Sequence, residues 1–231
     1  MKNILYLANI KEITSYSLWE WLLTNSSDEK KHFVQKFSFL DDKKRSILGE
    51  YLLKLALKEN QITDYQIKRT KHGKPFLKDI KDFKFNISHS GDWVVLACNT
   101  NNKEIGVDVE KICDTDYDGI SKRFFSNEEY EFLNNYSIQK EALKIFYMLW
   151  TLKESYVKML GVGFSIPLNS FSVIKNSVVK KQIRWQKKKK ICYLKNIEIL
   201  KGYQLSISSE DKEVEVSNKY KLVPLHQLIY L

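Results

Sequence analysis

The sequence is poor in cysteine and has no long apolar run. Its three cysteines, Cys98, Cys113 and Cys192, are scattered without a CxxC spacing, which predicts neither a disulfide framework nor a zinc site. The longest early apolar run, Ile4–Ala8, is too short for the core of a signal peptide. No later segment approaches the roughly 18 uncharged apolar residues of a membrane helix. These absences predict a soluble, cytoplasmic protein without a membrane partner.

Positive charge is what the chain has in excess. Its 38 Lys and Arg residues against 28 Asp and Glu residues give a formal net charge of +10. A basic protein attracts polyanions, and these include nucleic acid, a membrane surface, a nucleotide cofactor and an acidic protein. With 231 residues, 43% of them hydrophobic, the chain is long enough for one large domain or for two halves that each bury a core. Charge alone does not select the partner.

The segment Ile105–Glu110 alternates with the period of two that is typical of a half-buried strand. Asp108 and Glu110 therefore share a face, with their Cα atoms about 6 to 7 Å apart. Two carboxylates at that separation repel each other unless a cation neutralises them. A strand with two solvated acids is the commoner meaning of such a segment taken alone.

A third carboxylate lies in a predicted helix. Residues 145–150 are apolar nearly all round, which predicts a buried helix, and Glu154 and Lys158 come next on one helical face. A charged residue in a buried helix needs a partner. Asp108, Glu110 and Glu154 together form an oxygen ligand set that suits Mg²⁺, which usually shares its shell with substrate phosphates. A solvated Glu–Lys pair is the alternative interpretation of the helix.

Further cations lie in the first half of the chain. A helix is expected from an N-cap at Asp41–Asp42 to Glu59, and its first turns carry Lys43–Arg45. Cations at a helix N-terminus oppose the macrodipole, so either the surface tolerates them or an anion docks there. Residues 71–75 predict a turn that displays Lys74.

Residues 83–98 predict a hairpin with a polar tip at 88–92. Ser88 and His89 suggest a nucleophile and its base, but adjacent strand residues face opposite ways and do not form the hydrogen bond that this requires. Two interpretations stay open: these side chains donate to a phosphate, or they satisfy backbone groups of the turn.

The polar segment 111–120 predicts a connector between two halves. After it, Ser126 and Glu129 form a capping box that opens a helix, and another helix is expected from about Gln139 to Gly161. Short strands are then expected at 171–174, 183–185, 191–194, 203–207 and 214–216.

Five short motifs follow one another along the chain: Gly73–Pro75, Phe85–Ser90, Gly106–Glu110, Arg123–Ser126, and Trp150 with Lys153–Ser155 and Lys158. In order and spacing they closely resemble the 4′-phosphopantetheinyl transferases of the surfactin-synthetase-activating type, over residues 28–173. Each motif alone is weak, but five in register are specific. The resemblance implies an α+β fold of two similar α/β subdomains related by a pseudo-two-fold axis. We place these subdomains at residues 1–112 and 113–231, with the active site in the cleft between them.

The resemblance also implies a reaction: transfer of the 4′-phosphopantetheine group of coenzyme A to a serine of an apo acyl, peptidyl or aryl carrier protein, with release of adenosine 3′,5′-bisphosphate. By matching position, the Mg²⁺ ligands would be Asp108, Glu110 and Glu154. The coenzyme A contacts would be Lys30, Ser46, Lys74, Ser88, His89 and Lys158. Metal, lysine and histidine would together neutralise the pyrophosphate. The charge of +10 would attract acidic carrier proteins.

Two points stay open within this resemblance. Phe33 stands where the family often carries a second basic residue, so the grip on the 3′-phosphate would pass to Lys31 or Arg45, or be weaker. The general base has three candidates: Glu154, a metal-bound water, or Glu129 acting through a water.

Two other functions compete with the transferase. A nucleic-acid-binding module would use the net charge, the run Lys187–Lys190 and aromatic stacking, but it leaves the three acids unexplained. A Mg²⁺-dependent hydrolase of a nucleotide pyrophosphate would share the metal site and use water in place of serine. We expect the transferase, without a nucleic-acid partner and active as a monomer, because the pseudo-dimer supplies both walls of the cleft.

Overall fold

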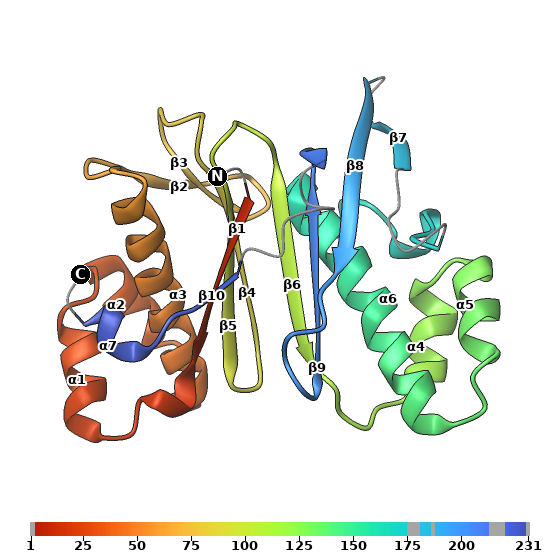
Figure 1. The fold of residues 1–231 in the computed structure, drawn as a ribbon, viewed down its shortest axis with the longest axis horizontal. Helices are drawn as coiled ribbons and strands as arrows, with labels where there is room; N and C mark the ends of the chain where they lie inside the picture. Colours follow the sequence, from red (N-terminus) through yellow and green to blue (C-terminus); the bar gives the residue numbers. More distant parts are fainter. Residues whose placement is uncertain (1–2, 175–180, 186–187, 213–219, 230–231) are drawn as a thin grey trace.

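Two β-sheets lie side by side in the middle of the molecule, and helices cover the outer side of each (Figure 1). This computed structural model describes residues 3–174, 181–185, 188–212 and 220–229. Four layers follow one another: helices, sheet, sheet, helices. None of the helices in these ranges combines the length and the apolar character that a membrane crossing requires.

The elements come in a simple order along the chain. Those of the first half are β1 (Asn3–Asn9), α1 (Tyr16–Thr24), α2 (Asp28–Val34), α3 (Leu40–Glu59), β2 (Ile67–Arg69), β3 (Pro75–Leu77), β4 (Lys84–Ser90) and β5 (Trp93–Asn99). The rest are β6 (Ile105–Lys111), α4 (Tyr117–Phe124), α5 (Asn127–Asn134), α6 (Gln139–Leu160), β7 (Lys181–Trp185), β8 (Lys188–Asn196), β9 (Tyr203–Ser209), β10 (Tyr220–Leu222) and α7 (Leu225–Leu228).

The first sheet has the strand order β10-β1-β5-β4, with β10 parallel to β1 and the other neighbours antiparallel. Alternate residues of β1 serve the two faces of this sheet. Tyr6 packs on the helix side with Leu48 and Leu52 of α3, whereas Leu5 packs toward the second sheet with Val107. The first sheet is therefore buried on both faces.

The second sheet has the order β6-β9-β8-β7 and is antiparallel throughout. The alternation predicted for β6 is confirmed. Val107 and Val109 pack against the first sheet, whereas Gly106 and Asp108 face α6. By the same alternation Glu110 shares the side of Asp108.

The helix α6 lies between the second sheet and the helices α4 and α5 (Figure 1). Phe146 and Leu149 are buried on it, so the prediction of a buried helix in this region is confirmed. The predicted end is confirmed too, because Gly161 adopts a φ of 65°, the left-handed conformation that glycine favours at this position.

Gly106 allows β6 and α6 to approach each other closely. A Cβ at this position would lie 2.0 Å from the carbonyl oxygen of Ser155 and 2.4 Å from the backbone nitrogen of Met159. No side chain fits there without moving the strand or the helix. The short approach is what brings Asp108 on β6 within reach of Lys158 on α6.

Most of the predicted elements are confirmed, among them the fold class of an α+β protein with two similar halves. The expected N-cap at Asp41–Asp42 is wrong: α3 begins at Leu40, and both acids lie in its first turn, where they interact favourably with the helix dipole. The polar tip at 88–92 is shorter than expected, because β4 continues to Ser90.

Two expectations in the second half are also wrong. The connector at 111–120 contains the start of α4, for which Asp116 accepts the capping hydrogen bond from the backbone of Gly119. Residues 171–174 form no strand, since the backbone N–H of Val173 donates to the Glu129 carboxylate and not to a neighbouring strand. The strand expected at 214–216 and Lys187 of the lysine run lie outside the described residues.

The expected boundary between residues 112 and 113 stays a prediction. Two features of the sheets bear on it: β6 pairs with β9 in the second sheet, and β10 pairs with β1 in the first. Val223 and Leu228 extend the core of the first half. The chain thus crosses between the halves twice, which ties them into one body.

We expect Gly106→Ala to destabilise the protein by about 3 kcal/mol or more, because overpacking at a rigid strand–helix contact forces backbone shifts. Gly49→Ala is the matched control, since a Cβ there would meet Ile87 at an ordinary 3.4 Å. Alanine also favours the helix at that position by about 1 kcal/mol. Urea unfolding of both variants measures the difference, and equal stabilities would contradict this account of the contact.

Candidate active site

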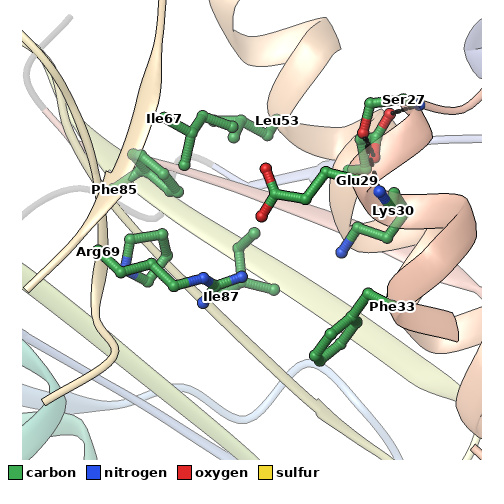
Figure 2. A pocket seen from close by; sticks show the side chains of 11 residues that line it. Ser27, Glu29, Lys30, Phe33, Leu53, Ile67, Arg69, Phe85 and Ile87 are labelled. Carbon is green, nitrogen blue, oxygen red and sulfur yellow. Dashed lines mark hydrogen bonds between the residues drawn. The ribbon is translucent and has the colours of Figure 1, made fainter. Parts of the chain in front are cut away.

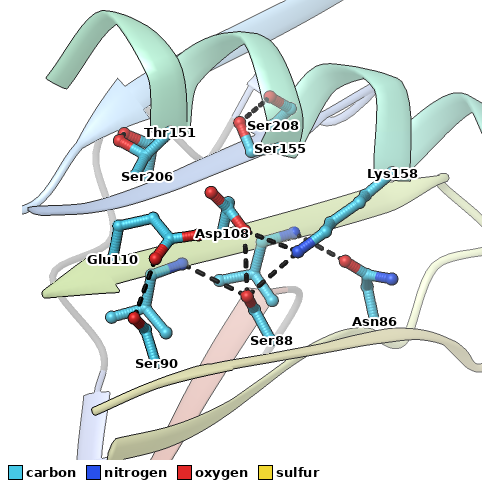
Figure 3. Close-up of polar contacts among 12 residues, drawn as sticks. Asn86, Ser88, Ser90, Asp108, Glu110, Thr151, Ser155, Lys158, Ser206 and Ser208 are labelled. Carbon is cyan, nitrogen blue, oxygen red and sulfur yellow. Dashed lines mark hydrogen bonds and ion pairs between the residues drawn. The ribbon is translucent and has the colours of Figure 1, made fainter. Parts of the chain in front are cut away.

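The two sheets are joined by hydrogen bonds from the backbone of β6 to side chains of β4. The N–H groups of Val107, Val109 and Lys111 donate to Asn86 Oδ1, Ser88 Oγ and Ser90 Oγ, at 2.9, 3.3 and 3.1 Å. Each donor lies 21 residues after its acceptor, so the two strands run in the same direction past each other. We call these three contacts the side-chain ladder (Figure 3).

The two acids of β6 receive further hydrogen bonds at this junction. Ser88 Oγ donates to Asp108 Oδ1 at 2.9 Å, and Ser90 Oγ donates to Glu110 Oε2 at 2.7 Å. Lys158 reaches across from α6, where its Nζ pairs with Asp108 Oδ1 and donates to Ser88 Oγ (Figure 3). The strand acids and a lysine of α6 therefore meet at this junction.

Glu154 belongs to the same group of charges. Burial raises the pKa of Glu154, and the negative charges of Asp108 and Glu110 raise it further, against the opposing effect of Lys158. Burial likewise raises the pKa values of Asp108 and Glu110. The three carboxylates thus lie within electrostatic range of one another in a partly desolvated place.

The chemistry of these acids suits a metal ion. Oδ2 of Asp108 is buried without a hydrogen-bond partner, and carboxylate oxygens are ligands that hard divalent cations prefer. Within the described ranges, however, no three His, Cys, Asp or Glu side chains are gathered closely enough to hold an ion. The donor chemistry fits a divalent cation, and side-chain movement would be needed to bring the three acids onto it.

A hollow between the halves has one of these acids, Glu154, in its wall. Asn86 and Ile87 of β4 form one wall, and Glu154 and Lys158 of α6 form the other. Lys74 lines the hollow as well, but the turn does not display it freely. Its Nζ donates to Glu104, at 3.0 Å, and to the carbonyl oxygens of Ile105 and Met159. In this arrangement Lys74 bridges the halves, and its ammonium is already occupied.

A second hollow, in the first half, contains a basic residue that the sequence did not reveal. Figure 2 shows Lys30 and Arg69 pointing into it from different elements, with Phe33 along one side. Lys30 also donates to Ser46 Oγ at 3.2 Å, and desolvation by burial lowers its pKa. Arg69 reaches this place because β2 pairs with β3, which sets it opposite Pro75. The signal, a three-residue strand before the Gly73–Pro75 motif, is too short to recognise.

Neither residue expected to compensate for Phe33 enters this hollow. Lys31 pairs with Asp28 and lines a separate groove beside α1. Arg45 donates to the carbonyl oxygen of Gly91 and to Asp42. Arg69 is the residue that accompanies Lys30.

His89 lies on the opposite side of β4 from Ser88, as the alternation of a strand requires. Its side chain keeps an exposed surface. Partial desolvation lowers the pKa of His89, and the positive charges of Arg45 and Lys158 lower it further. The ring is therefore close to cations on both sides of the strand.

Glu129 is placed away from the three acids. It is fully buried, and Lys153, also fully buried, donates to its Oε2. The backbone N–H groups of Ser126 and Val173 donate to the same carboxylate, so the predicted capping box is confirmed and extended. Lys153 and Thr151 are two positions apart, about 200° around the helix. Thr151 bonds Ser206 of β9, so the Glu129 pair faces away from the second sheet.

Comparison with known proteins gives matches over both halves of the chain. Residues 104–208 match the 4′-phosphopantetheinyl transferase superfamily, and residues 14–101 match the N-terminal region of 4′-phosphopantetheinyl transferases. The first match contains Asp108, Glu110, Glu154 and Lys158, and the second contains Lys30 and Arg69.

Individual relatives are similar over most of their length. The 4′-phosphopantetheinyl transferase Sfp of Bacillus subtilis (strain 168) is 35% identical over 184 residues, which is 78% of this chain and 80% of that protein. The 4′-phosphopantetheinyl transferase gsp of Aneurinibacillus migulanus is 35% identical over 212 residues, 90% of this chain and 86% of that protein. An L-aminoadipate-semialdehyde dehydrogenase-phosphopantetheinyl transferase of Homo sapiens is 34% identical over 168 residues, 64% of this chain and 53% of that protein.

We expect Glu129→Gln to lower the free energy of unfolding by about 3 to 5 kcal/mol, because it leaves the buried Lys153 without its counter-charge. Asp118→Asn is the control, since it breaks the exposed pair with Lys122 and should cost far less. Urea unfolding at neutral pH measures both losses. Equal losses would show that the buried pair is not an anchor of α6.

The acids should make the metal-free protein less stable as the pH rises. Their folded-state pKa values are raised, so the native state binds protons more tightly than the unfolded chain, and this stabilisation is lost as pH passes the raised pKa values. Glu154→Gln should therefore stabilise the protein at pH 8 by about 0.5 to 2 kcal/mol and flatten the loss of stability that begins above the ordinary glutamate pKa of about 4.3. Thermal unfolding in EDTA tests this, with exposed Glu131→Gln as control; a less stable Glu154→Gln variant at pH 8 would contradict it.

Proposed function

This chain belongs to the 4′-phosphopantetheinyl transferase superfamily, and we propose that it transfers the phosphopantetheine arm of coenzyme A to a serine of an apo carrier protein. It is a transferase, as its relatives are. The observation that carries the proposal is that Glu154 and Lys158 line a hollow between the halves, while Lys158 pairs with Asp108 and Glu154 lies within electrostatic range of Asp108 and Glu110. This group combines acids that would bind a cation with a lysine that would donate hydrogen bonds to a phosphate. Chemistry at a pyrophosphate requires both.

Asp108, Glu110 and Glu154 would hold Mg²⁺, for which the unsatisfied Oδ2 of Asp108 and the mutual repulsion of the acids are the support. When bound, the ion would neutralise the pyrophosphate of coenzyme A. The ammonium of Lys158 would turn from the Asp108 carboxylate to a phosphate oxygen. The lysine side chain is flexible, and both acceptors are anionic oxygens. His89, with Arg45 beside it, would donate to the same phosphates from the other side of β4.

The 3′-phosphate of coenzyme A would lie in the hollow of Lys30 and Arg69. Arg69 supplies the second cation in place of Phe33, and a guanidinium binds a phosphate with two parallel hydrogen bonds. Ser46 contributes a hydroxyl beside Lys30. Lys74 would act through its stem and through the seam that it closes with Glu104, because its ammonium already has three acceptors. Ser88 is likewise committed to Asp108 and would reach the coenzyme only indirectly.

The serine oxygen of the carrier attacks the β-phosphorus, a new P–O bond forms, and the bond to the bridging oxygen breaks, which leaves adenosine 3′,5′-bisphosphate. The serine proton has to leave during this step. We assign it to Glu154, because its carboxylate lines the hollow one helical turn before Lys158 and can accept a proton there.

The partner would be an acidic apo carrier protein, because a chain with a net charge of +10 attracts acidic surfaces and raises the rate of encounter. One chain supplies both walls of the hollow, so we expect a monomer to be active. We place the protein in the cytoplasm, where its three free cysteines would stay reduced.

The test is to incubate the protein with coenzyme A, Mg²⁺ and several apo carrier proteins and to weigh each carrier by mass spectrometry. We expect the gain of one phosphopantetheine, its loss in EDTA, and a loss of at least about 100-fold in rate for Asp108→Ala. Asp118→Ala, an exposed acid of α4, is the matched control and should keep the rate. If every type of carrier stays unmodified while coenzyme A is hydrolysed, the protein is a hydrolase and the proposed transfer is wrong.

A further inference from the structure

Ser90 contacts one of the three acids without having any place in the reaction described above. Its hydroxyl donates to Glu110 Oε2 at 2.7 Å and accepts from the backbone N–H of Lys111 at 3.1 Å. Among the described residues this is the hydrogen bond that Glu110 receives. Ser90 is the last residue of β4, on the opposite sheet from Glu110.

The side-chain ladder itself shows which part of this contact is structural. At the rung of Asn86 an amide oxygen accepts the N–H of Val107, and the strands are joined there without any carboxylate. An acceptor is therefore enough to hold β4 against β6. At Ser88 and Ser90 the acceptor is a hydroxyl, which adds a proton that the ladder does not need, and both protons go to acids.

The two serines differ in how much their acids depend on them. Asp108 is held by Lys158 as well as by Ser88, and it is 2% exposed, so packing also restrains it. Glu110 is only half-buried and has one more side-chain torsion than an aspartate. Its carboxylate would be free to turn toward solvent without the hydrogen bond from Ser90.

We propose that Ser90 is a positioning residue for the metal site: its hydroxyl holds Glu110 Oε2 and leaves the other oxygen, Oε1, for the cation. This inference rests on the proposed function, and it assigns to Ser90 a part that its contact with Lys111 alone does not require. Ligands of metal ions are oriented by such outer hydrogen bonds, and their loss typically weakens metal affinity about 10-fold to 100-fold.

The backbone contact of Ser90 is expendable, which makes the residue testable. Lys111 is exposed, so water can replace the hydroxyl on its N–H when Ser90 is removed. Ser90→Ala should therefore keep the fold. Ser90→Thr keeps the donor, and Ser90→Cys keeps the size with a weak donor.

A matched control is available in the same region. Ser208 of β9 and Ser155 of α6 form a hydrogen bond of 2.7 Å in a fully buried pair, and neither hydroxyl is hydrogen-bonded to one of the three acids. Ser208→Ala removes a serine hydrogen bond between the second sheet and α6, and it should change stability without changing metal binding.

The experiment measures Mn²⁺ binding by the EPR signal of the free ion, with coenzyme A present, alongside the thermal midpoint of each variant. We expect Ser90→Ala to weaken Mn²⁺ binding about tenfold, Ser90→Cys by less, and Ser90→Thr by no more than about twofold. The Mg²⁺ concentration for half-maximal transfer should rise in the same order, while the KM for coenzyme A stays near that of the wild type.

Two results would overturn the inference, and they differ from failure of the proposed function. If Ser90→Ala binds Mn²⁺ as tightly as the wild type, or if Ser208→Ala weakens binding equally, then Ser90 serves only the ladder. If the wild type itself neither binds Mn²⁺ nor modifies a carrier, the proposed function falls, and this inference falls with it.

Discussion

The ion pair between Lys158 and Asp108, at the seam between the second sheet and α6, is the interaction on which the site depends. Asp108 is almost wholly removed from water, and an unpaired buried carboxylate would cost several kcal/mol. The same seam brings Glu110 and Glu154 into electrostatic range, so negative charge accumulates where the protein solvates it poorly. Under the proposed function, a divalent cation and an anionic substrate would relieve this repulsion.

The helix α6 makes that seam possible because its two sides have different tasks. One side carries Lys153, whose buried pair with Glu129 ties the helix to α5 and to the segment after it. The other side presents Glu154 and Lys158 to the hollow. Lys153 and Glu154 are neighbours in sequence, yet the helical turn separates the buried ion pair of Lys153 from the carboxylate that lines the hollow.

The junction between the sheets explains why the site needs both halves. The N–H groups of β6 that face β4 find side-chain acceptors there, so the two sheets are joined while a hollow stays open between β4 and α6. The first half adds Lys30 and Arg69 in a hollow of its own. Under the proposed function, cation binding by the second half and phosphate binding by the first would meet along β4.

Much of this could be predicted from local pattern. Three features depend only on residues close in sequence: the alternation around Asp108, the spacing of Glu154 and Lys158, and the capping box at Glu129. Each of them, like the family, could be predicted from the sequence. The sequence by itself thus determined which residues share a strand face or a helix face, because backbone geometry sets those periods. Only the tertiary structure decided that Arg69 joins Lys30 and that Lys74 is already paired. Contacts between distant elements depend on how the sheets and helices pack, and no local period encodes that packing.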